Sequence, residues 1–290
     1  MRMLPAALLA TVIAFACTPA AAQDSGGSHR FVEVRSAKLF TQISGHGPPI
    51  LFLHGGLQFF DPSFLHQRSY FAADHTIIGI DQRGHGHSPD NRARLSYQEM
   101  ADDTAAVIRE LGVGPVDVVG HSDGGDVALL LARDHPELVR RMVISGANLR
   151  PGLPPDELQR RKALSSQQTA EKIRALGKFL PPRFRTNYEA VSPDGAEHWM
   201  TLLEKSYWMW LQPVVIEPAD LKKIAVPILV MAGDHDFTSI EETTEIYRGL
   251  PHGQLFILPD TGHGTLEDRP ELANLAIREF LERPADANPH

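Results

Sequence analysis

The sequence predicts an α/β protein, with a mostly parallel central sheet, helices on both of its faces and one helical insertion. Short all-apolar runs of strand length recur along the chain, and segments with helical periodicity separate them. This alternation is typical of strand–helix–strand units with parallel strands. The pattern stops between residues 150 and 220, where prolines and charged helical segments replace the apolar runs. We therefore expect this segment to be a helical insertion into the α/β frame.

The first two expected strands differ from the later ones. Residues 31–36 and 38–44 roughly alternate apolar and polar side chains, which predicts a hairpin. The later strands are all-apolar and are expected to be buried on both faces: 50–53, 76–80, 116–119, 142–144, 227–231 and 254–258. Helical patterns occupy residues 63–73, 97–111, 126–135, 240–250 and 271–282, and an amphipathic run follows residue 199 within the insertion.

The first residues have the features of a cleavable secretory signal peptide. Arg2 is followed by an apolar run over residues 4–16, and the small residues Ala20 and Ala22 precede Gln23. We expect a signal peptide at 1–22 and a secreted or periplasmic mature chain. A lipoprotein anchored at Cys17 is less favoured, because residues 14–16 lack the leucine that such signals usually carry. The apolar run is shorter than the about 20 residues that span a bilayer, so no stable membrane insertion is expected.

Composition excludes several classes of function. Cys17 is the only cysteine, so a mature chain that begins at Gln23 has no disulfide and no catalytic thiol. The formal net charge of −8 opposes binding to nucleic acid or to anionic lipid. Cleavage leaves 290 − 22 = 268 residues. We assign 23–149 and 221–290 to the α/β core and 150–220 to the insertion.

A serine lies on a sharp turn between a strand and a helix. The strand at 116–119 runs into Gly120-His121-Ser122-Asp123-Gly124-Gly125, and a helical run follows. This strand, G-x-S-x-G turn and helix make up the setting in which a serine hydroxyl is exposed above a sheet. Glycines two residues before and two residues after the serine avoid side-chain collisions on such a strained turn. The alternative is a glycine-rich helix start with a capping serine, and the flanking strand argues against it.

A serine hydroxyl is a poor nucleophile until a base removes its proton, and that base needs a group to orient it. Both follow later in the chain. The strand at 227–231 is followed by Asp234 and Asp236, and the strand at 254–258 is followed by His263 between two glycines. All three lie after the carboxyl ends of strands, where such sheets bind their ligands. The order Ser, Asp, His is that of one large class of hydrolases.

A metal site is not expected. Asp234, His235 and Asp236 are close in the sequence, but neither they nor the other histidines show the H-E-x-x-H spacing or another ligand pattern. We expect His54, His85 and His121 to support the geometry of their loops.

Four motifs together resemble the α/β-hydrolase superfamily, over about residues 31–281. They are Leu53-His54-Gly55-Gly56, the run from Asp81-Gln82-Arg83-Gly84 to His85-Gly86-His87-Ser88, the turn at Ser122, and the loops of Asp236 and His263. The resemblance implies that Asp236, the second acid of the G-D-x-D loop, completes the triad, with Ser122 as nucleophile and His263 as base. It also implies an oxyanion hole formed by the backbone N–H groups of Gly56 and Asp123. Asp123 departs from the apolar residue that often follows the nucleophile, and its carboxylate could disfavour anionic substrates.

The resemblance also implies that the insertion at 150–220 is a helical cap over the active site. All three tryptophans lie in it, and a stripe at helical spacing around Trp199 and Trp210 forms either cap core or a ligand contact. An apolar substrate pocket is expected, lined by Phe59, Phe60, Trp199, Trp208 and Trp210.

These residues predict an exported serine hydrolase that cleaves a small carboxylic ester or lactone through an acyl-enzyme on Ser122. No cofactor is required, and the expected partner is a small-molecule substrate. The serine at the turn argues against dehalogenases and epoxide hydrolases, which place an aspartate there. A carbon–carbon bond hydrolase and a cofactor-free haloperoxidase use the same triad and stay open as alternatives. A non-catalytic small-molecule binding protein is less favoured, because all three triad positions are filled. The oligomeric state is left open.

Overall fold

The computed structural model describes residues 27–35, 37–150, 154–212 and 216–283. The expected signal peptide and Cys17 lie outside the described residues. The chain forms one sheet of eight strands: β1 (Ser28–Val34), β2 (Ala37–Gly45), β3 (Pro49–Leu53), β4 (Thr76–Ile80), β5 (Val116–His121), β6 (Val139–Ser145), β7 (Ile228–Gly233) and β8 (Gly253–Leu258). Their order in the sheet is β1-β2-β4-β3-β5-β6-β7-β8. β2 is antiparallel to both neighbours, and β3 to β8 are parallel, which confirms the predicted mostly parallel sheet.

Next to β3 the chain changes its direction across the sheet. After β3 the chain moves to β4 on one side and then returns past β3 to β5 on the other side. Loops that follow β3 and β5 therefore diverge, and open α/β sheets bind their ligands at the carboxyl ends of the strands at such a point. Those two loops carry Gly56 and Ser122.

Successive residues of a strand point to opposite faces of the sheet and pack into two separate hydrophobic cores. In β3, Leu51 and Leu53 belong to one core, while Ile50 and Phe52 belong to the other. Helices cover both faces of the sheet: α1 (Phe60–Ser63), α2 (Leu65–Phe71), α11 (Thr265–Asp268) and α12 (Pro270–Glu282) on one, and α3 (Tyr97–Leu111), α4 (Asp123–Asp134), α9 (Pro218–Leu221) and α10 (Ile240–Gly249) on the other. Burial on both faces explains why the strands are apolar throughout.

Local signals set the bounds of α3. The Ser96 side chain accepts a hydrogen bond from the backbone N–H of Glu99, and Gly112 ends the helix in the left-handed conformation at φ 67°. The helix expected at 63–73 instead forms two short helices that begin at Phe60. The backbone N–H of Phe60 donates to the Asp81 carboxylate over 2.9 Å, a long-range contact that the local pattern does not contain.

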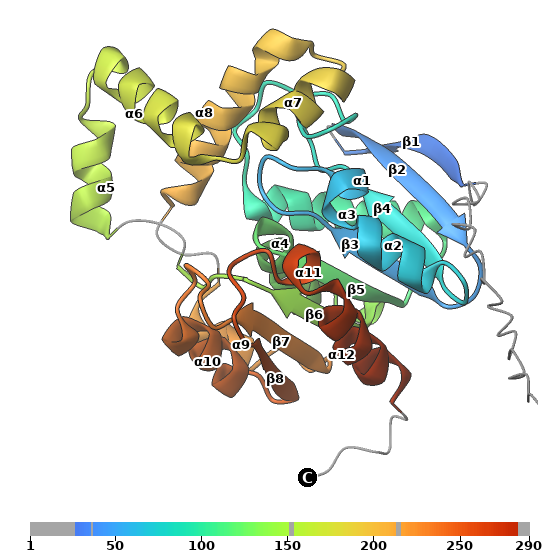
Figure 1. Cartoon of the computed structure of the whole chain (residues 1–290). Coiled ribbons are helices and arrows are strands. Elements are labelled where there is room, and N and C mark those ends of the chain that lie inside the picture. The colour runs from blue at the N-terminus through green and yellow to red at the C-terminus, as the bar shows by residue number, and fades with distance from the viewer. Residues whose placement is uncertain (1–26, 36, 151–153, 213–215, 284–290) are drawn as a thin grey trace, which may run out of the picture.

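The insertion forms a helical cap at one end of the sheet (Figure 1). It contains α5 (Pro155–Lys162), α6 (Ser166–Phe179), α7 (Pro182–Val191) and α8 (Trp199–Trp210). Polar contacts tie it to the core: Lys205 and His198 both bond Asp90, and Arg183 pairs with Glu267. Among the described residues, none of the helices has the length and apolar character needed to cross a bilayer.

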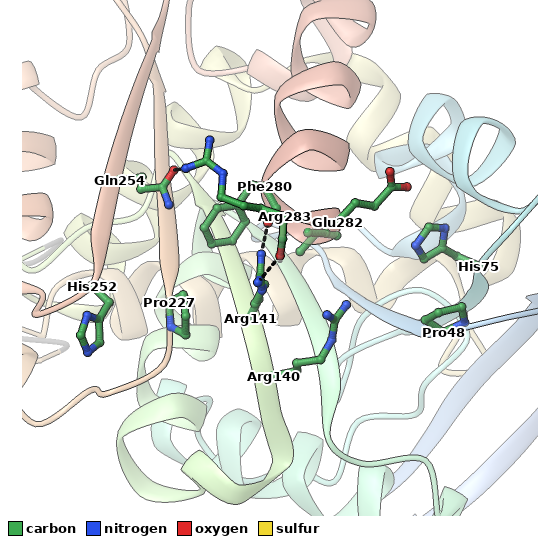
Figure 2. A pocket seen from close by; sticks show the side chains of 11 residues that line it. Pro48, His75, Arg140, Arg141, Pro227, His252, Gln254, Phe280, Glu282 and Arg283 are labelled. Carbon is green, nitrogen blue, oxygen red and sulfur yellow. Dashed lines mark hydrogen bonds between the residues drawn. The ribbon is translucent and has the colours of Figure 1, made fainter. Parts of the chain in front are cut away.

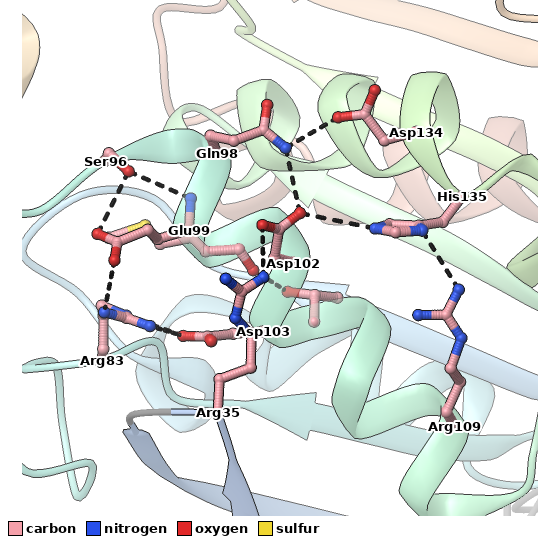
Figure 3. A network of polar contacts seen from close by, with 12 residues as sticks. Arg35, Arg83, Ser96, Gln98, Glu99, Asp102, Asp103, Arg109, Asp134 and His135 are labelled. Atoms are coloured by element: carbon pink, nitrogen blue, oxygen red, sulfur yellow. Dashed lines mark hydrogen bonds and ion pairs between the residues drawn. The ribbon is translucent and has the colours of Figure 1, made fainter.

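Arginine side chains tie two core helices to neighbouring segments. Arg83 is buried and donates to the Asp103 carboxylate over 2.8 and 2.6 Å, which joins the Asp81–Ser88 loop to α3 (Figure 3). At the opposite edge of the sheet, Arg141 donates to the backbone carbonyls of Phe280 and Arg283 at the end of α12 (Figure 2). A cation at a helix C-terminus satisfies carbonyls that have no partner within the helix.

Candidate active site

Ser122 lies on a strained turn between β5 and α4. Its φ of 54° and ψ of −125° place it in a region that residues with side chains rarely adopt. The turn is anchored because the Ser122 N–H donates to the Ser145 carbonyl over 2.8 Å. A side chain at Gly120 would overlap the backbone of Gly124, and one at Gly124 would overlap the Leu53 carbonyl. Both glycines are therefore required by the close approach of β5, α4 and β3.

His263 and Asp236 lie together after β8 and β7. His263 Nδ1 and Asp236 Oδ1 are 2.8 Å apart, and the carboxylate is buried. The same carboxylate oxygen accepts the backbone N–H of Thr238 over 2.9 Å, which holds it in place. Gly146, at φ 63°, allows the close approach of the imidazole, since a side chain there would come within 2.7 Å of His263 Cε1. A proton on Nδ1 leaves Nε2 of His263 free to accept one.

The loop of His263 is joined to the serine turn through His121. Nε2 of His121 and the His263 carbonyl are 2.8 Å apart, so this nitrogen donates. Burial, and next the neighbouring His263, lower the pKa of His121 to about 4. The ring is therefore neutral at physiological pH and acts as a brace between the loops that follow β5 and β8.

The loop after β3 brings Gly55 and Gly56 next to the serine. A side chain at Gly55 would come within 3.2 Å of the Ser122 Cβ atom. His54 braces this loop: its Nε2 accepts the backbone N–H of Gln82 over 2.9 Å, and its Nδ1 lies 2.8 Å from the Gly55 carbonyl. Burial lowers the pKa of His54, so the ring stays neutral and can make both bonds. The backbone of this loop is the surface on which an oxyanion site is expected.

The side chain of Asp123 turns toward that same loop. It is buried, and it accepts hydrogen bonds from Tyr97 Oη over 2.9 Å and from Trp210 Nε1 over 2.9 Å. A side chain at Gly56 would overlap Oδ2 of Asp123 and would come within 2.7 Å of Trp210 Cζ2. The carboxyl group and the indole of α8 therefore lie directly against Gly56.

The structure brings only part of the expected aromatic set to this region. Trp210 touches Asp123, and Phe59 lines a small crevice with Leu57 in the loop after β3 and Phe184 on α7. Phe60 is instead buried in the core with Phe52 and Phe64. Its backbone hydrogen bond to Asp81 turns it to the opposite face of the sheet from Asp123 and α4.

The two other tryptophans stay within the cap. Trp199 packs on Tyr188 with 5.7 Å between ring centroids, so it is cap core. Trp208 lines a cavity of about 500 Å³ with Ile173 and Met200, all of them cap residues. The residues of the helical stripe therefore have different roles, because only Trp210, at the end of α8, contacts the residue next to the serine.

Asp234 bonds to the backbone of a neighbouring loop and not to His263. Its Oδ1 accepts the backbone N–H of Thr261 over 3.0 Å, and this bond, with a second from the Asp260 backbone, lowers the pKa of Asp234. Asp234 thus holds the loop that leads from β8 to His263. In the described part of the chain, histidine and acidic side chains form no cluster of three or more that could hold a metal ion.

Three residues of the site have no separate signal in the sequence. Tyr97 begins α3 and reaches Asp123, Gly146 follows β6 and makes room for His263, and Phe237 lies on the imidazole with 4.0 Å between ring centroids. Each is distant in sequence from its partner or belongs to no known spacing. A glycine directly after a buried strand is the one feature that could have drawn attention to Gly146.

A cavity of about 590 Å³ lies elsewhere, at the amino ends of the strands (Figure 2). Pro48, Arg141, Pro227 and Gln254 line it, and they lie near the starts of β3, β6, β7 and β8. Ser122, Asp236 and His263 all follow the opposite ends of strands. This cavity is therefore separate from the candidate active site.

The fold and these motifs define the class of protein: a serine hydrolase of the α/β-hydrolase superfamily. A model of the alpha/beta hydrolase family matches residues 50–274, which is more than half of the chain, and the chain belongs to that family. It is an enzyme of the hydrolase class.

Several known proteins are similar over most of their length. The sn-1-specific diacylglycerol lipase ABHD11 of Mus musculus is 28% identical, with 81% of each chain covered. The (E)-2-((N-methylformamido)methylene)succinate hydrolase of Acinetobacter baylyi is 26% identical, over 86% of this chain and 95% of that one. Among solved structures, Est816, described as an N-acyl homoserine lactone degrading enzyme, superposes with a TM-score of 0.67 at 26% identity, over 87% of this chain and 100% of Est816.

Proposed function

We propose that the chain hydrolyses a small carboxylic ester or lactone through an acyl-enzyme on Ser122. The observation that carries the proposal is the 2.8 Å contact between His263 Nδ1 and the buried Asp236, at the same edge of the sheet as a serine on a strained turn. The relatives add support, because the mouse protein is named as a lipase and Est816 as a lactone-degrading enzyme.

In the proposed mechanism, His263 Nε2 accepts the proton of Ser122 as the serine oxygen attacks the carbonyl carbon. Asp236 holds the proton on Nδ1 and stabilises the imidazolium that forms. Backbone N–H groups of Gly56 and Asp123 stabilise the oxyanion. His263 then returns the proton to the leaving alcohol, and a water activated by the same histidine releases the acid.

A fluorophosphonate probe tests the activated serine. The wild-type protein should be labelled covalently and the Ser122→Ala variant should not be labelled. The purified protein is then assayed with acyl esters of graded chain length, with lactones and with vinylogous diketones. Hydrolysis of esters or lactones is the expected result. Turnover of the diketones alone would replace the proposal with carbon–carbon bond hydrolysis, and absence of labelling would favour a binding protein.

We also propose that the protein is exported, with cleavage between Ala22 and Gln23. Intact-mass analysis of protein expressed with its full leader in a bacterial host tests this. The mass expected is that of a chain starting at Gln23, in the periplasmic or secreted fraction. A retained leader, or a lipid on Cys17, would contradict the proposal.

A further inference from the structure

An acidic side chain, that of Asp123, lies beside the expected oxyanion hole, where a negative charge is unfavourable. Asp123 has its backbone N–H at the start of α4, next to Ser122, and its carboxyl group against Gly56. A negative charge there opposes the negative charge that develops on the carbonyl oxygen during acylation. This repulsion is strongest in a buried site, where water does not screen it.

Neighbouring groups hold the carboxyl group in this place. Tyr97 on α3 and Trp210 on α8 of the cap each donate a hydrogen bond to it over 2.9 Å. Burial raises the pKa of Asp123, and burial together with Asp123 raises the pKa of Asp126 well above its ordinary value. The titratable groups around Asp123 are thus Tyr97, Asp126 and His263, and in the described part of the chain no arginine or lysine bonds its carboxylate.

A positive charge that arrives with the substrate would remove the repulsion. Asp123 would then be ionised and paired in the bound complex, and the paired charges would exert little net field on the oxyanion. The carboxyl group and the expected oxyanion donor belong to the same residue. The carboxyl group also lies against Gly56, the other expected donor. With the carbonyl oxygen bonded to these two donors, a substituent on the adjacent carbon would lie near the carboxyl group.

We propose that Asp123 determines substrate specificity, by selecting acyl groups that carry an ammonium group on the carbon next to the scissile carbonyl, as in esters of α-amino acids. This inference rests on the proposed function, since it assumes an acyl-enzyme on Ser122. Tyr97 and Trp210 are positioning residues that fix the carboxylate toward Gly56. The same carboxylate disfavours acyl groups with a negative charge at that carbon.

Three p-nitrophenyl esters that differ in a single substituent test the proposal. They are the esters of alanine, of isobutyric acid and of methylmalonic acid, which place an ammonium, a methyl and a carboxylate group on the same carbon. Assays at about pH 6.5, with the spontaneous rate subtracted, keep the amine protonated, because its pKa is about 7.7. The wild-type protein should prefer the alanine ester to the isobutyrate ester in kcat/KM by about 10- to 100-fold, and the methylmalonate ester should be the poorest.

Asp123→Asn should remove most of that preference, chiefly by lowering kcat/KM for the alanine ester at least about 10-fold. Asp126→Asn is the matched control, since it replaces a buried acid on the same helix whose Oδ1 accepts the Asn148 N–H over 2.7 Å instead of facing Gly56. It should leave the ratio of the two esters unchanged. Equal ratios in the wild type and Asp123→Asn, or an equal change in both variants, would overturn the inference.

Fluorophosphonate labelling separates this inference from the function on which it rests. Asp123→Asn should still be labelled, because the probe is uncharged and the triad is intact. Wild-type protein that is labelled and hydrolyses the isobutyrate ester without a preference for alanine would contradict the specificity alone. Protein that is neither labelled nor active on any ester would contradict the proposed function as well.

Discussion

At the scale of single residues, the two acids after β7 have different roles: Asp236 orients the histidine, and Asp234 holds the loop. Asp236 accepts a hydrogen bond from His263 Nδ1, and Asp234 accepts one from the backbone N–H of Thr261. Asp236→Asn should lower kcat by about 1,000- to 10,000-fold with little change in stability, because an amide cannot stabilise the imidazolium and favours the wrong tautomer. Kinetics with an ester substrate and thermal unfolding of each variant check this.

Asp234→Asn is the matched control for that prediction. It should lower the melting temperature and leave kcat within a few-fold of wild type, since its contact is to backbone at the base of the loop. An inactive but well-folded Asp234→Asn variant, beside an active Asp236→Asn variant, would reverse the assignment.

A second residue-scale prediction concerns Phe237, whose ring lies on His263 although 74% of the residue is exposed. An exposed aromatic face against a cation contributes about 0.5–1 kcal/mol. Phe237→Ala should therefore lower kcat by about 2- to 5-fold, because the imidazolium formed with the serine adduct loses this contact. Phe237→Leu, which keeps apolar volume without a π face, should lose a similar amount. Wild-type kcat in Phe237→Ala would show that the ring has no part in the reaction.

At the scale of elements, the turn between β5 and α4 depends on packing of backbone against backbone. Gly124→Ala should lower the free energy of unfolding by roughly 2 kcal/mol or more and abolish most activity, since its methyl group would overlap the Leu53 carbonyl. Gly177→Ala in α6 is the control, because its methyl group would meet only the Leu203 side chain, at 3.2 Å. Denaturant unfolding measures both. A Gly124→Ala variant as stable as Gly177→Ala would contradict the packing argument.

Elements also differ in how far the sequence predicts them. The bounds of α3 are predicted correctly at 97–111, because Ser96 and Gly112 are local capping signals. The helix expected at 63–73 is wrong in its start and continuity, because a distant carboxylate, Asp81, fixes the backbone at Phe60. Local signals therefore give reliable bounds only where the cap lies in the same segment.

At the scale of the whole molecule, neutral buried histidines make stability depend on pH. Burial, and next His54, lower the pKa of His85 to about 3, below its ordinary value of 6.5. The unfolded chain therefore binds a proton at this residue as the pH falls below about 6.5, while the folded chain does not until about pH 3. The stability that His85 contributes is complete above pH 6.5 and is lost as the pH falls through this window.

Urea unfolding of the wild type and His85→Gln at pH 7 and pH 5 measures this contribution. The wild type should lose up to about 2 kcal/mol from His85 between these values, and the variant should lose none of it. The difference in unfolding free energy between the two proteins should therefore become smaller at pH 5. The pH-dependent contributions of the buried acids Asp103 and Asp117, whose pKa values are raised by burial, are the same in both proteins and cancel in this difference. A constant difference would contradict the neutral burial of His85.

The sequence by itself determined the fold class, the strand and helix alternation, and the candidate residues Ser122, Asp236 and His263. Apolar periodicity, glycine spacing and chain order are local or ordered along the chain, so they can be read without coordinates. Only the tertiary structure decided which side chains surround the serine. It placed Asp123, Tyr97 and Trp210 together from α4, α3 and α8, and it moved Phe60 into the opposite core. Contacts between distant segments depend on how helices pack on the two faces of the sheet, and a pattern within one segment does not contain that information.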